Sequence, residues 1–331
     1  MTFLISLIIT FVGCLFLTSK PLEQAKPNNR SMHINNIPTS GGIGIFLGFM
    51  IATIYESKTI PIILIILTFI FIIGLLDDKD RLSKIFRFLS QIFISIISIY
   101  LIGGLSLHPI LFLIFIFFMT YLINAHNFMD GIDSLLTLQS LFYLVTIIFL
   151  LNEYSSWLTS IQIMIGALLA FMFFNHSPAK LFMGNTGSYF LGTYISIIMI
   201  GLHLSTEINI LTSLILVTAC VVDTAYVIIR RFYDKLISIY NVNQSIIIAL
   251  TGSIKHVFTM PHRTHNYQKL AIKHQNHTKA VLIIMIFNIL WCLPLAILST
   301  MQDSFSVLYV FVSYTPYILW CYKNQTGVEE N

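Results

Sequence analysis

The run IPIILIILTFIFIIGLL, residues 60–76, contains no charged residue and ends directly at Asp77 and Asp78. A helix of about 20 apolar residues is needed to cross a bilayer core about 30 Å thick. Similar runs recur along the whole chain, which has 331 residues, 56 % of them apolar and 10 % charged. A soluble domain averages about 25 % charged residues. Since so few charges cannot cover a water-facing surface, lipid must cover most of this one.

The apolar runs predict an all-α polytopic membrane bundle of about 10–11 transmembrane helices, folded as a single domain, 1–331. The first run lacks a basic start, so we expect a retained helix and not a removed signal peptide. The expected helices cover residues 1–18, 42–55, 60–76, 88–103, 109–123, 134–151, 158–175, 189–204, 209–229, 280–299 and 304–322.

Positive charge gathers on alternate connections between these helices. All but one of the 18 Lys and Arg residues fall in one set, formed by 19–41, 77–87, 124–133, 176–188, 230–279 and the tail from 323. The other set, 56–59, 104–108, 152–157, 205–208 and 300–303, holds only Lys58. The positive-inside rule makes the first set cytoplasmic. We therefore expect the N-terminus outside, the C-terminus in the cytoplasm, and the chemistry on the cytoplasmic face.

Two of these connections are rich in carboxylates. Asp77 and Asp78 end an apolar helix, where carboxylates can hold Mg²⁺ or take a proton. The loop NAHNFMDGID, residues 124–133, has two carboxylates and no Lys or Arg, and Asp130 and Asp133 would share a face if it is helical. Such an oxygen-rich loop suits a hard divalent cation. The alternatives are a solvated charge cluster at the first place and helix capping at the second.

Other polar groups suggest anion binding. Arg30 and His33 in the first loop could meet an anionic group, or merely form a basic loop beside the membrane. The stretch KLFMGNTGS, residues 180–188, could present helix N-terminal amides to an anion, or be a capped turn. Asp223 lies inside an apolar run, which makes it a functional candidate, with pairing to an arginine as the alternative.

The last long connection, 230–279, carries His262, Arg263 and His265. Two histidines spaced by three with an arginine between them could bind phosphate. Zinc is the rival ligand, but no cysteine and no third clustered ligand accompany them.

Together these motifs resemble the polyprenyl-phosphate N-acetylhexosamine-1-phosphate transferases, the glycosyltransferase 4 family. The run NAHNFMDGID is similar to the family's N-x-x-N-x-x-D-G-x-D signature, and Asp77-Asp78 to its acidic pair. The FMGN run, residues 182–185, resembles the F-M-G-D motif, and Asp223 stands before an arginine pair as in the family. The run HRTHNYQ from His262 looks like the H-R-S-H-x-Y-Q form of the O-antigen-initiating branch.

The chain departs from the family pattern in three places. Asn185 stands where the family usually has Asp, so the metal site should carry less charge. Lys26 replaces a usual Asp in the first loop. Residues 241–254 look like an insertion, partly apolar, that could lie on the membrane surface.

The resemblance implies transfer of N-acetylhexosamine 1-phosphate from a UDP-sugar to polyprenyl (undecaprenyl) phosphate, releasing UMP, with Mg²⁺ as cofactor. This is the first membrane step of O-antigen, hence lipopolysaccharide, or other cell-envelope glycan synthesis. The implied location is the bacterial inner (plasma) membrane. The implied partners are the lipid bilayer, undecaprenyl phosphate and UDP-N-acetylhexosamine, with no nucleic acid; a homodimer is compatible.

The resemblance also implies roles for individual residues. Asn127 and Asn185 would be metal ligands. Asp77, Asp78, Asp130 and Asp133 would be catalytic, with Asp77 as base or lipid-phosphate orienter. Substrate would be bound by Arg30, His33, Lys84, Phe182, Asp223, His262, Arg263 and His265. The alternatives are a secondary transporter, which should hold polar groups near the bilayer midplane, and a catalytically impaired homologue.

Overall fold

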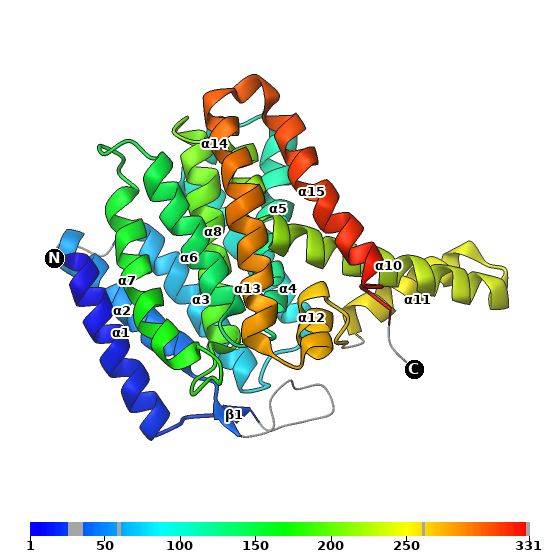
Figure 1. Ribbon diagram of the computed structural model, residues 1–331, viewed down its shortest axis with the longest axis horizontal. Helices are drawn as coiled ribbons and strands as arrows, with labels where there is room; N and C mark the ends of the chain where they lie inside the picture. The colour runs from blue at the N-terminus through cyan, green and yellow to red at the C-terminus, as the bar shows by residue number, and fades with distance from the viewer. Residues whose placement is uncertain (26–35, 58–60, 260–261, 329–331) are drawn as a thin grey trace.

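The computed structural model describes residues 1–25, 36–57, 61–259 and 262–328. Helices make up nearly all of it, and β1 and β2 form a short antiparallel pair in the first loop. Figure 1 shows most helices running side by side, with α10 and α11 leaving the bundle on one side. The elements are α1 (Thr2–Ser19), β1 (Gln24–Ala25), β2 (Ile37–Pro38), α2 (Gly41–Ser57), α3 (Ile62–Asp78), α4 (Lys84–Leu101), η1 (Gly104–Ser106), α5 (Pro109–Met129), α6 (Leu135–Leu150), α7 (Leu158–Asn175), α8 (Gly184–Leu204), α9 (Ile210–Leu216), α10 (Thr218–Asn243), α11 (Ile246–Thr259), α12 (Asn266–His274), α13 (His277–Phe287), η2 (Asn288–Cys292), α14 (Leu293–Met301), η3 (Asp303–Phe305) and α15 (Ser306–Lys323).

The predicted helical membrane bundle is confirmed. Within the described residues, seven helices are long and apolar enough to cross a membrane, or eight if the bent pair α9–α10 is one span. The shorter α2, α3 and α6 lie at three further predicted positions.

The predicted helix 209–229 is divided into two helices. The chain breaks at Val217 into α9 and α10, which meet at 79°. Thr218 stabilises the break, because its hydroxyl donates to the Ile215 carbonyl at 2.7 Å. The apolar run continues through the break, so hydropathy gave no sign of it.

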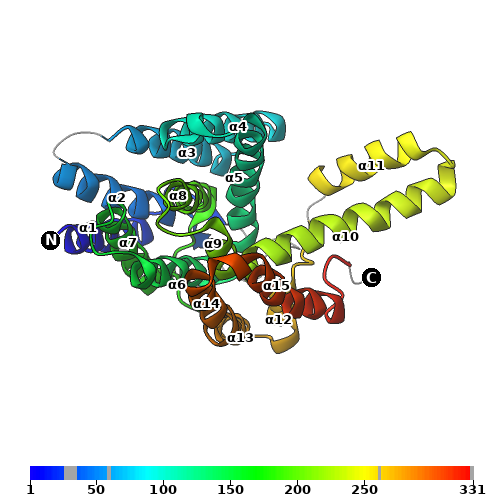
Figure 2. The ribbon, with the colours of Figure 1, turned by 90° about the horizontal axis from the view of Figure 1, so that it is seen from above.

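Helix α8 forms the centre of the bundle. Within the apolar stretch of α8, 89 % of the residues are buried, against 28 % in the peripheral α1. Figure 2, seen from above, places α8 between α2, α3, α5 and α9, all of which contact it. Elements that touch α8 at its N-terminal end therefore share one end of the bundle.

The predicted insertion, 241–254, is helical. It covers the end of α10, the break at Gln244 and Ser245, and the first nine residues of α11, which packs back along α10 to form an arm (Figure 2). Ile246, Ile247 and Ile248 are exposed on this arm. Contact of the arm with the membrane surface stays a prediction.

Helix α3 approaches α8 closely because Gly74 has no side chain. A Cβ at this position would lie 2.6 Å from the Thr186 Cα and 2.8 Å from the Asn185 carbonyl oxygen. Such distances do not occur in packed proteins, so a larger residue must push α3 away from α8. Asp77 and Asp78 lie one turn farther along α3 and would move with it.

We expect Gly74→Ala to lower the free energy of unfolding by about 1–3 kcal/mol, the usual cost of overpacking. Thermal unfolding in detergent measures this. Gly13→Ala is the matched control, since its Cβ would meet Gly44 at an ordinary 3.5 Å. That variant should be neutral or stabilising, because alanine favours a helix over glycine. Equal melting temperatures for the two variants would contradict this account of the α3–α8 contact.

Candidate active site

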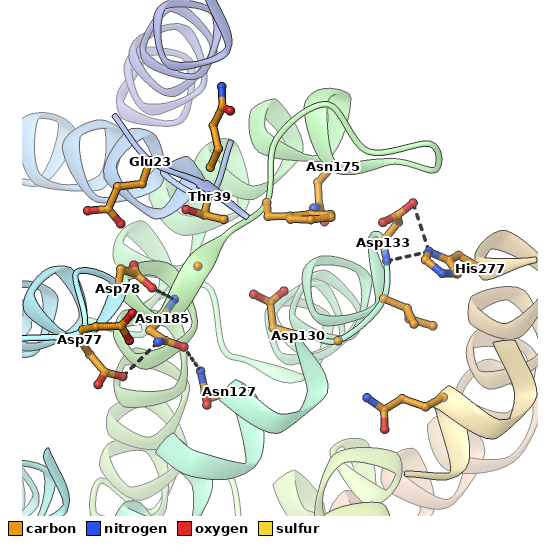
Figure 3. Close-up of a pocket in the computed structure, with 17 residues that line it drawn as sticks. Glu23, Thr39, Asp77, Asp78, Asn127, Asp130, Asp133, Asn175, Asn185 and His277 are labelled. Carbon is orange, nitrogen blue, oxygen red and sulfur yellow. Dashed lines mark hydrogen bonds and ion pairs between the residues drawn. The ribbon is translucent and has the colours of Figure 1, made fainter. Parts of the chain in front are cut away.

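An open cavity of about 490 Å³ lies at one end of the bundle, where α3, α5 and α7 end and α8 and α13 begin. Its lining is strongly acidic and, among the residues that the structure describes, includes no Lys or Arg. The six lining carboxylates are Glu23, Asp77, Asp78, Asp80, Asp130 and Asp133. We call this the acidic cavity. Figure 3 shows Asp77 and Asp78 on one side, Asp133 on the other, and Asp130 between them.

Asp78 caps the N-terminus of α8. Its carboxylate accepts hydrogen bonds from the backbone N–H of Asn185 at 2.8 Å and of Thr186 at 2.9 Å, and from the Thr186 hydroxyl. The helix dipole and these orphan N–H groups favour a negative charge there. The amides of residues 180–188 thus do face an anion, as the sequence suggested, but in this structure that anion is Asp78.

Asp77 is held by three donors and is 8 % exposed. Its Oδ2 accepts from Arg87 Nη1 at 3.0 Å, from Asn185 Nδ2 at 3.0 Å and from the Tyr189 hydroxyl at 2.9 Å. Arg87 balances the charge from the side away from the acidic cavity's lining. Asp77 is therefore fixed in both orientation and charge environment.

Asn127 and Asn185, the predicted metal ligands, contact each other. Asn127 Nδ2 donates to Asn185 Oδ1 at 2.7 Å and to the Ser188 hydroxyl at 3.0 Å. Since Asn185 also donates to Asp77, its amide joins the ends of α3 and α5 through the first turn of α8 (Figure 3).

Asp130 and Asp133 differ in their surroundings. Asp133 forms an ion pair with His277 at 3.2 Å and accepts from the Ala179 backbone N–H at 3.2 Å. Burial raises the pKa of Asp133, but the hydrogen bond and charge of His277, together with hydrogen bonds from Ser177 and Ala179, outweigh it, so the net shift is downward.

Asp130 points into the cavity and has neither hydrogen bond nor ion pair at its carboxylate within the described residues (Figure 3). Its pKa lies well above the ordinary value, first because of burial and then because Asp78 and Asp133 are near. Both causes disfavour the charged form, and a bound cation would oppose them.

The histidine segment, residues 262–268, lies beside the cavity and is anchored by Asp223. This fully buried carboxylate accepts from His265 Nδ1 at 3.0 Å and from the backbone N–H of Asn266 and Tyr267 at 3.0 and 3.2 Å. Asp223, for which the resemblance implied a substrate contact, thus caps α12 and orients His265. Burial, His265 and Arg231 together lower the pKa of His262 to about 3, so its imidazole is neutral at pH 7.

The histidine segment also contacts the loop of residues 124–133, which we call the acidic loop. The Tyr267 hydroxyl donates to the Phe128 carbonyl at 2.6 Å, and Gln268 lines the cavity. A Cβ on Gly131 would collide with the Tyr267 hydroxyl, so a glycine is needed for this close approach.

The structure brings seven predicted residues to one cavity. They are Asp77, Asp78, Asn127, Asp130, Asp133, Phe182 and Asn185. Four others do not line it within the described chain: Asp223, His262, Arg263 and His265 belong to the neighbouring segment or its anchor. Lys84 is the exposed first residue of α4, and Arg30 and His33 lie outside the described residues.

Sequence reasoning missed the roles of Arg87, Tyr189 and His277. Tyr189 sits one turn after Asn185 on α8, so the i, i+4 spacing could have placed both on the face that meets Asp77. His277 stands alone before an apolar run, and no sequence signal linked it to Asp133.

Comparison with known proteins identifies the family. The sequence model of glycosyl transferase family 4 matches residues 60–203. A phospho-N-acetylmuramoyl-pentapeptide-transferase of Streptococcus uberis is 32 % identical over 232 residues, which is 60 % of this chain and 68 % of the relative. The chain belongs to glycosyl transferase family 4. The family inferred from the motifs is thus confirmed.

Two other relatives in the family carry related names. A probable undecaprenyl-phosphate N-acetylglucosaminyl 1-phosphate transferase of Bacillus subtilis is 27 % identical over 307 residues, covering 87 % of this chain and 80 % of the relative. An undecaprenyl-phosphate alpha-N-acetylglucosaminyl 1-phosphate transferase of Thermotoga maritima is 31 % identical over 180 residues, covering 52 % of this chain and 54 % of the relative.

We expect Asp223→Asn to lower the free energy of unfolding by about 3–5 kcal/mol, because an amide cannot accept all the bonds that this buried carboxylate accepts. Asp234→Asn, on the same helix, is the control. Asp234 pairs with Arg230 on the surface, where an ion pair contributes about 0–1 kcal/mol. Denaturant or thermal unfolding compares the two. Similar losses in both variants would show that Asp223 does not anchor the histidine segment.

Proposed function

We propose that this chain transfers N-acetylhexosamine 1-phosphate from a UDP-sugar to undecaprenyl phosphate or a related polyprenyl phosphate. A phosphate oxygen of the lipid attacks the phosphorus that bears the sugar. The bond from that phosphorus to the bridging oxygen breaks, and UMP leaves. The observation that carries the proposal is an acidic cavity at one end of a membrane bundle, in a family whose relatives are named for transfer to undecaprenyl phosphate.

The residues present fit a hard divalent cation such as Mg²⁺. Asp130 has a carboxylate without a partner among the described residues, inside a lining of six acids without Lys or Arg. The oxygens of Asn127 and Asn185 lie in the same cavity, and oxygen ligands are those that Mg²⁺ prefers. No cluster of three His, Cys, Asp or Glu with metal-site geometry occurs in the described chain, so amide oxygens and water would complete the ligands. When bound, Mg²⁺ would neutralise the diphosphate.

The chain's own residues then position the substrates. A phosphate monoester has a second pKa near 6, so the lipid phosphate is largely ionised at pH 7 and needs little help from a base. Asp77, fixed by Arg87, Tyr189 and Asn185, would orient the attacking phosphate. Asp78 would hold α8 in place beneath it.

Binding of the nucleotide is assigned to other residues of the site. The Phe182 ring lines the cavity and offers a face for uracil. The histidine segment, together with Arg30, His33 and Lys84, would contact the phosphates and the sugar. His262, neutral at pH 7, would act there as a hydrogen-bonding group and not as a cation.

The charge pattern of the loops supports a cytoplasmic position for the acidic cavity. All cavity residues except Asn175 come from the connections that hold nearly all Lys and Arg. We place the chain in the bacterial plasma membrane, at the first membrane step of O-antigen or another envelope glycan. A transporter is less well supported, because the six cavity carboxylates gather at one end of the bundle and not at mid-depth.

Purified protein with undecaprenyl phosphate, Mg²⁺ and a panel of UDP-N-acetylhexosamines should release UMP with at least one donor. Asp130→Asn should lower the rate at least ten-fold, since loss of even an outer-shell partner of a metal ligand typically costs about 10- to 100-fold. Asp303→Asn is the control and should keep full activity, because Asp303 lies in η3, just before α15, and does not line the cavity. Release of no UMP with any donor would overturn the proposed function, and donor-dependent ion flux without UMP would favour transport.

Asn185→Asp should convert a neutral link into a cation-dependent one. The substitution puts a carboxylate oxygen where Nδ2 now lies, 3.0 Å from Asp77 Oδ2. Two carboxylates this close repel each other unless a cation or proton is shared. We expect a lower melting temperature in EDTA, recovery on adding Mg²⁺, and about ten-fold tighter Mn²⁺ binding by electron paramagnetic resonance.

Asn185→Ala is the matched control for this variant, because it removes the link without adding charge. Its Mn²⁺ affinity should be no better than that of the wild type. Unchanged Mn²⁺ affinity in Asn185→Asp would show that residue 185 does not face the cation.

A further inference from the structure

The residues that follow α15 fold back onto the histidine segment. We call residues 324–328 the C-terminal clamp. Asn324 Nδ2 donates to the Asn266 side-chain oxygen at 2.7 Å, and the Gly327 backbone N–H donates to the Thr264 carbonyl at 2.9 Å. Thr264 and Asn266 are the two neighbours of His265. The clamp therefore binds the histidine segment on both sides of this histidine.

The clamp has a defined packed structure. Thr326 is 1 % exposed, and its backbone N–H donates to the Cys321 carbonyl at 2.9 Å, which closes the chain back on the end of α15. Gly327 has a left-handed backbone, with φ +86°, and a Cβ there would lie 2.9 Å from the Cβ of Arg230. Only glycine satisfies both conditions without strain. The clamp is thus wedged between α10 and the histidine segment.

The residues held by the clamp lead directly to the acidic cavity. The Asn266 backbone N–H donates to Asp223, and the Tyr267 hydroxyl donates to the Phe128 carbonyl. The next residue, Gln268, lines the cavity. A shift of Asn266 would therefore move Tyr267, which contacts the acidic loop, and Gln268, which lines the cavity.

We propose that the C-terminal clamp is a positioning element of the active site and that Asn324 is its main positioning residue. Asp223 holds the histidine segment from inside the bundle, and the clamp holds it from the outer side. Within the described chain, no hydrogen bond joins the clamp to a residue of the cavity lining, so it acts through the segment and not on substrate or cation. The catalytic part of this inference rests on the proposed transfer reaction.

Three variants test the clamp. Truncation after Lys323 removes it, Asn324→Ala removes one hydrogen bond, and truncation after Val328 is the control that keeps it whole. Lys323→Ala is a second control, at the exposed residue before Asn324. An ordinary hydrogen bond corresponds to a factor of about five. We expect kcat to fall about five-fold in Asn324→Ala and more after the longer truncation, with the Mn²⁺ affinity of Asn324→Ala near wild type and its melting temperature lower by no more than about 2–4 °C.

Hydrogen exchange separates this inference from the proposed function. Exchange at the amides of residues 264–268 should quicken about five-fold in Asn324→Ala and more after truncation, whatever reaction the chain performs. If the longer truncation does not fold, Gly327→Ala is used in place of that truncation, because strain at this residue displaces the clamp. If these amides exchange at the wild-type rate both in Asn324→Ala and in the clamp-disrupting variant, the clamp does not hold the histidine segment and the proposal is wrong. Faster exchange with unchanged kcat would overturn its role in catalysis.

Discussion

The N-terminal end of α8 is where the acidic cavity is assembled. Its first backbone N–H groups have no partner within the helix, and Asp78 at the end of α3 supplies one. The approach that this requires is possible because Gly74, one turn earlier on α3, presents no side chain to α8. Asp77 follows from the same contact, because it then reaches Asn185 and Tyr189 on the first turns of α8.

Three of the cavity aspartates form hydrogen bonds or ion pairs with other parts of the fold, whereas Asp130 does not within the described chain. Asp77 is balanced by Arg87, Asp133 by His277, and Asp78 by a helix terminus. Arg87 and His277 make a negative charge tolerable at Asp77 and Asp133, whereas at Asp78 burial outweighs the hydrogen bonds from the helix terminus and raises the pKa. Among these four aspartates, only Asp130 lacks such a partner in the described chain, and so it is the group most able to take an added cation.

Much of the fold could be predicted from the sequence because apolar length is a direct response to bilayer thickness. The positions of the helices and the convergence of Asp77, Asn127, Asp133 and Asn185 on one end followed from hydropathy and from loop alternation. The 79° bend at Val217 could not be predicted, since the sequence there stays apolar while the backbone turns.

The pairing of distant side chains was equally hidden. Asp223 was visible as a charge in an apolar run, but not its four donors, which come from the histidine segment and from Tyr317 on α15. His277 and Arg87 gained their roles only from long-range packing. A single sequence reports which groups are unusual, and the fold decides whether they face a ligand or one another.

The sign of the charge inside the cavity has a consequence for the order in which ligands can arrive. The described lining of the acidic cavity holds six carboxylates and no Lys or Arg, and only Asp77 and Asp133 pair with a cationic side chain, so it disfavours the approach of an anion. A free nucleotide or phosphate monoester would be repelled on approach, whereas a divalent cation would be attracted and would offset part of the negative charge. Encounter with any polyanion should thus be fastest when it travels as a metal complex, and added monovalent salt should weaken the repulsion of the bare anion.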